Sequence, residues 1–132
     1  EANVKSYSVG FGTNDGTVAA ASNWDEAMEI KRVKPAISKS YEYLFHQVEE
    51  PNFLFGLNNL KSSNILNTLS VPKLARAIGV IYRPETALAS HYFQANLLKQ
   101  FDEYVWIDRT QAVVPIEAGL LKGLPDTYPF GL

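Results

Sequence analysis

Two short runs of apolar residues, 77–82 and 104–107, constrain the fold of this chain more than any other feature. Each run is too short for a helix of ordinary length and is rich in β-branched or aromatic side chains. Such runs are typical of strands buried on both faces, as in a parallel sheet. The first run ends at Arg83-Pro84, because proline cannot donate to a ladder and favours an extended residue before it. The pattern predicts two core strands.

Other segments carry the patterns of further strands and helices. Apolar residues between Tyr41 and Val48 recur at helical spacing, after capping residues 38–40 and before Pro51. The expected strands are residues 7–11, 53–57, 77–82 and 104–107, and the expected helices begin near residues 23, 38, 62 and 97. Because strands alternate with helical segments, the sequence predicts an α/β protein with a mostly parallel sheet.

Charge and composition narrow the classes of partner and chemistry. The 132 residues fit one domain, and a net charge of −2 gives no basic footprint for nucleic acid or an anionic membrane. No apolar run approaches the roughly 20 residues of a transmembrane helix. The lack of cysteine rules out disulfides and thiolate catalysis, and zinc-site spacings are also absent. We therefore expect a cytoplasmic protein with no nucleic-acid, membrane or metal partner.

Two blocks of longer motifs follow one another along the chain. The first contains VGFGT, GTV, AASNWD and KRV within residues 9–33, and the second contains AIGVIYRPET, SHYF, QFD and IDRT within residues 77–110. Together they resemble the C-terminal part of the erythromycin esterase-like hydrolases. The resemblance extends over residues 6–115, and several long motifs in the correct order are more specific than any single short pattern.

The resemblance implies a three-layer α/β/α domain, with helices on both faces of the sheet, of which this chain is a part. Members of that family are longer, and the chain begins at Glu1 without an initiating methionine. We therefore expect residues 1–115 to be the C-terminal segment of the domain and residues 116–132 to be an irregular tail. Apolar strands need cover on both faces, so we expect pairing with the remaining N-terminal part of the domain, or self-association.

The resembled family is understood to hydrolyse carboxylic esters with water that histidine and glutamate activate, and no cofactor is implied. Its catalytic histidines lie in motifs upstream of the region matched here, and neither His46 nor His91 lies in such a motif. The resemblance implies a parent that cleaves a small-molecule ester, with macrolide lactones as one candidate, while this segment holds no catalytic residue. Two alternatives are another substrate and a non-catalytic binding or structural module of the same fold.

Polar residues follow two of the expected strands, at the edge where α/β sheets bind ligands. The candidates for substrate binding or for support of the site are Asn14, Asp15, Thr17, Arg83 and His91. In the structural alternative, Arg83 pairs with Glu85 or Asp108, and His91 bonds a backbone carbonyl. Both interpretations place these side chains in packed loops after core strands.

Three further features have competing interpretations. The glycine pattern from Gly10 to Gly16 departs from the dinucleotide-binding fingerprint by one residue, and a turn between two extended segments is the simpler interpretation. Lys31, Arg32 and Lys34 form a basic cluster that lies either in solvent or against an anionic group of a substrate or partner. His46 lies opposite the apolar stripe of its helix, which predicts an exposed residue without a catalytic role.

Overall fold

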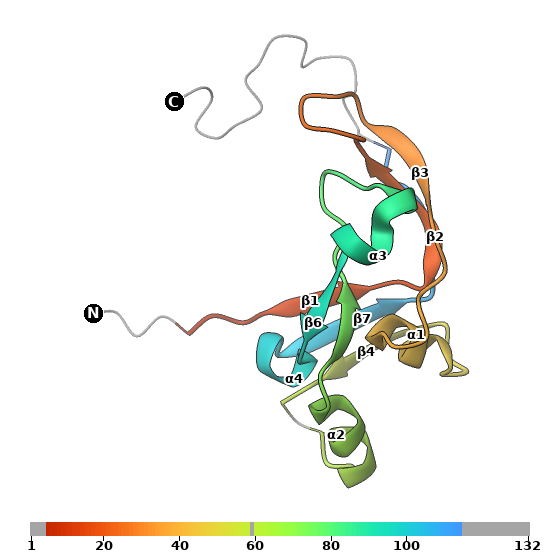
Figure 1. The fold of residues 1–132 in the computed structure, drawn as a ribbon. Helices are drawn as coiled ribbons and strands as arrows, with labels where there is room; N and C mark the ends of the chain where they lie inside the picture. The colour runs from red at the N-terminus through yellow and green to blue at the C-terminus, as the bar shows by residue number, and fades with distance from the viewer. Residues whose placement is uncertain (1–4, 59, 115–132) are drawn as a thin grey trace.

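A computed structural model describes residues 5–58 and 60–114 of the chain. Strands and short helices alternate along it, which confirms the α/β class (Figure 1). The elements in chain order are β1 (Val9–Gly12), β2 (Asp15–Ala20), β3 (Glu29–Val33), α1 (Tyr41–His46), β4 (Asn52–Gly56), α2 (Ser63–Ser70), β5 (Lys73–Arg76), the 3₁₀ helix η1 (Pro84–Thr86), α3 (Ala87–Ser90), β6 (Tyr92–Ala95), α4 (Leu97–Gln100), β7 (Glu103–Ile107) and β8 (Arg109–Thr110). The strands form three sheets, ordered β1-β7-β4, β3-β2-β8 and β5-β6.

The central strand of the first sheet is β7, which confirms the strand predicted at residues 104–107. Its β-branched and aromatic residues favour extended backbone, and they alternate between the faces: Tyr104 and Trp106 are buried, whereas Ile107 is exposed. β7 pairs in parallel with β1 and antiparallel with β4, which lies close to its expected range. Burial on both faces was the wrong prediction for this strand, because described residues cover one face only.

Helix α1 packs on the covered face of this sheet. The Ser40 hydroxyl accepts a hydrogen bond from the backbone N–H of Tyr43 at 3.2 Å, which caps the helix where the sequence predicted its start. Phe45 packs against aromatic rings of β4 and β7, with centroid separations of 5.4–5.5 Å. The helix ends at His46, so Val48 lies beyond it and is exposed, although the stripe predicted its burial.

Residues 77–82 do not form the predicted core strand. The strand in this region is β5, just before them, and it pairs antiparallel with β6. Residues 77–82 run on as an extended segment in which Ile81 makes an isolated bridge to Ala21, and Val80 is exposed. Tyr82 alone is deeply buried. The β-branched residues predicted extended backbone correctly, but the segment crosses between sheets and finds few ladder partners.

Strand pairing also departs from the prediction of a mostly parallel sheet. Among the described strands, β1–β7 and β2–β8 are parallel, whereas β2–β3, β4–β7 and β5–β6 are antiparallel. For β2 and β3 the physical reason is the connection: residues 21–28 join them without the crossover helix that a parallel pair would need, so they form a hairpin. The antiparallel pairs β4–β7 and β5–β6 join strands that are separated by other elements, so their direction depends on the tertiary fold.

The turn between β1 and β2, at Thr13 and Asn14, confirms a turn between two extended segments. The helix expected near residue 23 is absent, and residues 21–28 form the connection between β2 and β3. Asp25 has a φ of 63°, in the left-handed region that interrupts a right-handed helix. The weak capping pattern at Asn23 therefore belongs to a turn.

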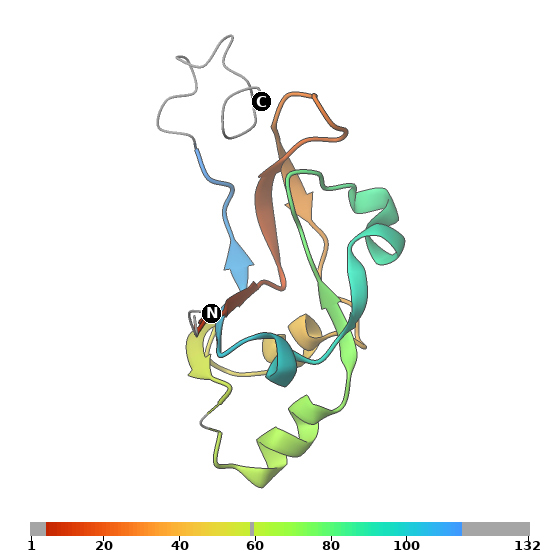
Figure 2. The ribbon, with the colours of Figure 1, turned by 90° about the vertical axis from the view of Figure 1, so that its left-hand side faces the viewer.

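The remaining predicted helices are present but short. α2 follows Ser62 and lies at the end of the molecule opposite β2 and β3, as the two views show (Figure 2). α4 buries Leu97 beside the first sheet. The described residues contain no helix that is long and apolar enough to cross a membrane. The expected irregular tail at 116–132 lies outside the described residues.

One face of the β1-β7-β4 sheet is apolar and open. Phe11, Val105 and Leu54 lie directly opposite one another across the three strands, and the flanking pairs are Val9 with Glu103 and Ile107 with Asn52. Phe11 is 70% exposed and Leu54 is 60% exposed. Contiguous apolar surface of this kind marks a place where another element or chain is bound.

Candidate functional site

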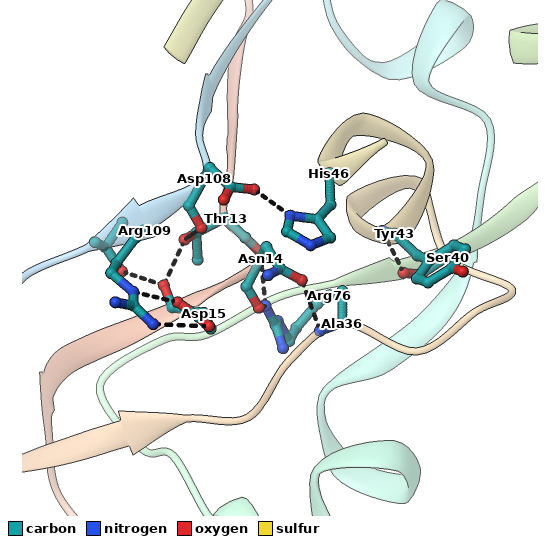
Figure 3. A network of polar contacts seen from close by, with 11 residues as sticks. Thr13, Asn14, Asp15, Ala36, Ser40, Tyr43, His46, Arg76, Asp108 and Arg109 are labelled. Atoms are coloured by element: carbon teal, nitrogen blue, oxygen red, sulfur yellow. Dashed lines mark hydrogen bonds and ion pairs between the residues drawn. The ribbon is translucent and has the colours of Figure 1, made fainter. Parts of the chain in front are cut away.

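The carboxyl ends of β1 and β7 meet because these two strands are parallel neighbours. Asp108 follows β7, and its backbone carbonyl accepts hydrogen bonds from the N–H groups of Asn14 and Asp15 at 3.0 and 3.1 Å. The turn after β1 is thereby joined to the end of β7, and polar side chains from both gather there (Figure 3). This edge matches the sequence prediction for Asn14 and Asp15.

The acidic and amide side chains at this edge have defined partners. Asp15 accepts a hydrogen bond from Arg109 Nε at 2.9 Å, and this interaction lowers the pKa of the Asp15 carboxyl. Asn14 is buried, and its Oδ1 accepts a hydrogen bond from the backbone N–H of Ala36 at 3.1 Å. Asn14 is thus committed to holding the segment after β3, while Asp15 is held by β8.

Arg76, at the end of β5, binds the same turn from another side. Its guanidinium donates hydrogen bonds to the carbonyls of Thr13, Asn14 and Lys34 at 2.6, 2.7 and 2.7 Å. It also lies over the Tyr92 ring, 5.6 Å from the centroid. Arg76 therefore joins the β1–β2 turn to the β5–β6 hairpin, a role that its position in the sequence did not reveal.

Glu42 in α1 is the buried ionisable residue nearest to this arginine. Its Oε1 accepts a hydrogen bond from the backbone N–H of Arg76 at 2.8 Å, and its Oε2 has no hydrogen-bond partner among the described residues. Burial raises the pKa of the Glu42 carboxyl above its ordinary range. A carboxyl of this kind, beside a cavity, is a candidate for proton chemistry that the helix pattern alone did not identify.

Replacing Glu42 with Gln tests this environment. An acid with a raised folded-state pKa binds more protons folded than unfolded, so its contribution to stability falls as the pH rises above the ordinary value of 4.5. Gln is always neutral and keeps the acceptor for Arg76. We expect Glu42→Gln to gain stability relative to the parent chain as the pH rises from 4 towards the raised pKa.

Thermal melting of both proteins in one buffer series measures this difference, because other titrating groups cancel in the comparison. A melting-temperature difference that stays constant from acid to neutral pH would show that the Glu42 carboxyl is not desolvated as the structure indicates.

His46 contacts Asp108 at this edge, with 2.7 Å between Nδ1 and Oδ1. The prediction that His46 is exposed is confirmed. The contact was not predicted, because 62 residues separate the partners and only the packing of α1 beside β7 brings them together. A carboxylate on one ring nitrogen orients an imidazole for work at the other nitrogen, so this pair is a second candidate for proton transfer.

A cavity of about 360 Å³ opens beside these strand ends. Its walls are mostly apolar and include Phe11, Ile78 and Ile107, and its polar groups come from Thr17, Arg76, Glu42 and neighbouring residues. An apolar cavity with a few convergent polar groups is the usual form of a small-molecule site. Neither described histidine lines it.

The structure does not join all five predicted site residues. Asn14, Asp15 and Thr17 lie together, and Thr17 lines the cavity. Arg83 lies elsewhere, with its side chain bonded to Ser22 and Asn23 in place of the two carboxylates considered above.

His91 is held by the backbone through both ring nitrogens. Nε2 accepts a hydrogen bond from the Arg83 N–H at 3.1 Å, and Nδ1 lies 3.2 Å from the carbonyl oxygen of Ala77. This geometry fits the tautomer with its proton on Nδ1. The ring also packs 5.0 Å from the Tyr82 ring. His91 therefore fixes the loop that carries Arg83.

No group of three or more histidine and carboxylate side chains suited to a metal ion occurs in the part of the chain that the structure describes. The carboxylates of Asp15 and Asp108 are instead paired with Arg109 and His46.

Comparison with known proteins gives one family and two similar folds. The model of the family described as erythromycin esterase matches residues 2–110. A solved succinoglycan biosynthesis protein superposes with a TM-score of 0.66 and 23% identity, over 80% of this chain and 24% of that chain. A protein from Bacillus cereus superposes with a TM-score of 0.64 and 22% identity, over 80% of this chain and 25% of that one. The chain thus spans about a quarter of the length of these solved chains.

Proposed function

The chain belongs to the erythromycin esterase family, and from that premise we propose that it forms the C-terminal part of a hydrolase that cleaves carboxylic esters. The observation that carries the proposal is the cavity at the carboxyl ends of β1 and β7. Its apolar walls suit the hydrocarbon part of a small-molecule ester, and its polar groups can orient the ester group. Macrolide lactones are one candidate class of substrate.

Ester hydrolysis needs a base that activates water. No histidine from the described residues lines the cavity, and both ring nitrogens of His91 are bonded to backbone. The proposal therefore assigns the general base to the rest of a longer protein. This chain contributes the wall of the cleft, with Thr17 facing the substrate and Asn14 and Asp15 holding the edge in place.

The open face of the β1-β7-β4 sheet supports the same arrangement. Its apolar residues, Phe11, Val105 and Leu54, would be covered by the remaining part of the domain, and covering helices would complete a three-layer α/β/α fold. The solved chains of similar fold are long enough to supply such a layer. In the isolated chain, a second copy is the available cover, so self-association is expected.

Filling the cavity tests its role in a longer protein that carries this chain. Gly79 lines the cavity, and a Cβ built on it meets nothing within 4 Å. Gly79→Leu therefore adds a bulky side chain at the wall of the cavity, at a position where a Cβ meets no described atom. We expect kcat/KM for ester hydrolysis to fall by about 10–100-fold, as for a misplaced substrate, with little change in melting temperature.

Ala89→Leu is the matched control, because it also enlarges a small exposed residue and lies in α3, outside the cavity and away from the open sheet face. Steady-state kinetics with aryl esters and a macrolide give the comparison. Equal activity of the two variants would show that this cavity is not part of the substrate site. No ester hydrolysis by the longer protein itself would favour a non-catalytic binding or structural module.

A further inference from the structure

A second cavity, of about 510 Å³, lies between β3, the Ser22–Asn23 turn and the start of η1. Its lining includes four cationic side chains, Lys31, Arg32, Lys34 and Arg83, against two carboxylates, Glu29 and Glu85. The excess of positive charge is local, because the whole chain has a net charge of −2. We propose that this cavity binds a small oxyanion, a carboxylate or a phosphate group.

Lys31 is held in place before any ligand binds. Its side chain is only 11% exposed, and Nζ donates hydrogen bonds to Ser22 Oγ at 2.6 Å and to the Tyr82 carbonyl at 2.9 Å. An ammonium group has three donors. Glu29 Oε2 lies 3.7 Å from Nζ, so the two groups form an ion pair whose separation is too long for a hydrogen bond. One donor of a nearly buried cation is therefore available to a ligand in the cavity.

Arg83 is fixed from the opposite wall. Its Nε donates to the Ser22 carbonyl at 2.9 Å, and Nη2 donates to Asn23 Oδ1 at 2.8 Å. Its backbone N–H is bound by His91, which makes His91 a positioning residue for this site. The remaining guanidinium donors have no partner among the described residues. A fork of this kind matches the two oxygens of a carboxylate or phosphate.

Ser22 is the shared anchor of the two cations. Its hydroxyl accepts from Lys31, and its carbonyl accepts from Arg83, so the two positive charges are held beside one residue. Bringing like charges together in a partly buried place costs Coulomb energy. The Glu29 carboxylate offsets part of this cost at Lys31, and an anion between the two cations would offset more of it. Two segments far apart in sequence, the β2–β3 hairpin and the turn before η1, converge on this arrangement, which distinguishes it from a solvated run of basic residues.

The sequence alone allowed two interpretations of the basic cluster: exposure to solvent or contact with an anionic group. In the structure the cluster forms one wall of a cavity, and Arg83 contributes to the other wall. Lys31 comes from β3 and Arg83 from the turn before η1, 52 positions later by residue number. The cavity shares no lining residue with the one at the ends of β1 and β7. Binding of an oxyanion here does not depend on whether that other cavity hydrolyses esters.

Isothermal titration of a longer protein that carries this chain tests the proposal. Inorganic phosphate and acetate are titrated separately, at constant ionic strength with chloride as the reference anion. We expect one or both to bind more tightly than chloride, and the better ligand identifies the phosphate or carboxylate preference. Arg83→Gln and Lys31→Gln should each weaken that binding roughly 10-fold or more, since each removes charge-assisted hydrogen bonds.

Lys99→Gln is the matched control, because it removes one exposed positive charge from α4, outside the cavity. It should leave the affinity unchanged. If Arg83→Gln fails to fold, Arg83→Lys keeps the charge, loses the fork and should bind acetate less tightly than the parent. The proposal is overturned if neither anion binds better than chloride, or if the cavity variants bind as well as Lys99→Gln.

Discussion

Replacing Gly16 with Ala is expected to lower the free energy of unfolding by about 3 kcal/mol or more, although the change removes no functional group and adds only a methyl group. Gly16 has a φ of 123°, which L side chains rarely adopt. A Cβ at this position would meet the backbone of Thr110, with its oxygen 2.1 Å and its nitrogen 2.6 Å away. Backbone atoms cannot move aside as a flexible side chain does, so the pairing of β2 with β8 would be lost.

Urea unfolding of the two proteins measures the change in free energy of unfolding. Gly56→Ala is the control, because it adds the same methyl group to a strand where nothing lies within 4 Å. That change should stay within about 0.5 kcal/mol of the parent. If the two variants proved equally stable, the close approach of β2 and β8 at the end of β7 would be wrong.

The 132-residue chain alone is expected to hydrolyse no ester above the rate in buffer. The cavity at the carboxyl ends of β1 and β7 contains no histidine from the described residues, and the Glu42 carboxyl that lines it is buried, with its Oε1 bonded to the Arg76 N–H. Without a base that reaches substrate, water is not activated. A longer protein that supplies the base should exceed the uncatalysed rate by about 10⁶-fold or more, as enzymes typically do.

Aryl esters and a macrolide, assayed with the chain and with the longer protein at equal molar concentration, give this comparison. The size of the isolated chain in solution must be measured alongside, since its open sheet face favours self-association. A saturable rate from the chain alone that Gly79→Leu abolishes, while Ala89→Leu does not, would show that the segment contains its own base. His46, with Asp108 on its Nδ1, would then be the first residue to replace.

Local pattern was sufficient for several elements. β7 and β4 were predicted because consecutive β-branched and aromatic residues favour extended backbone wherever they pack. The start of α1 was predicted because the Ser40 cap and the spacing of Tyr41 and Phe45 depend on neighbours within two turns. The motifs around residues 9–33 and 77–110 predicted the family, which the match over residues 2–110 confirms.

The local sequence pattern did not show which strands pair with one another. Residues 77–82 satisfy the same apolar criterion as 104–107, yet they lie between sheets, with Val80 exposed, because they run from the end of β5 to a bridge with Ala21 at the end of β2. The exposed face of β7 was not predicted for the same reason, because local pattern does not determine which elements pack together. An apolar strand sequence indicates that both faces need cover, but it does not show whether the covering layer belongs to this chain or to another part of the protein.

The candidate site divides along the same line. The positions of Asn14, Asp15 and Thr17 at a strand end were determined by sequence, since a strand followed by turn-forming residues places them there whatever the strand pairs with. Their partners were decided by tertiary structure: Asp15 and Arg109 are 94 positions apart, and Asn14 and Arg76 are 62 apart. Hydrogen bonds and ion pairs act over a few ångströms of space, so contacts between such distant positions exist only after the elements that carry them have packed.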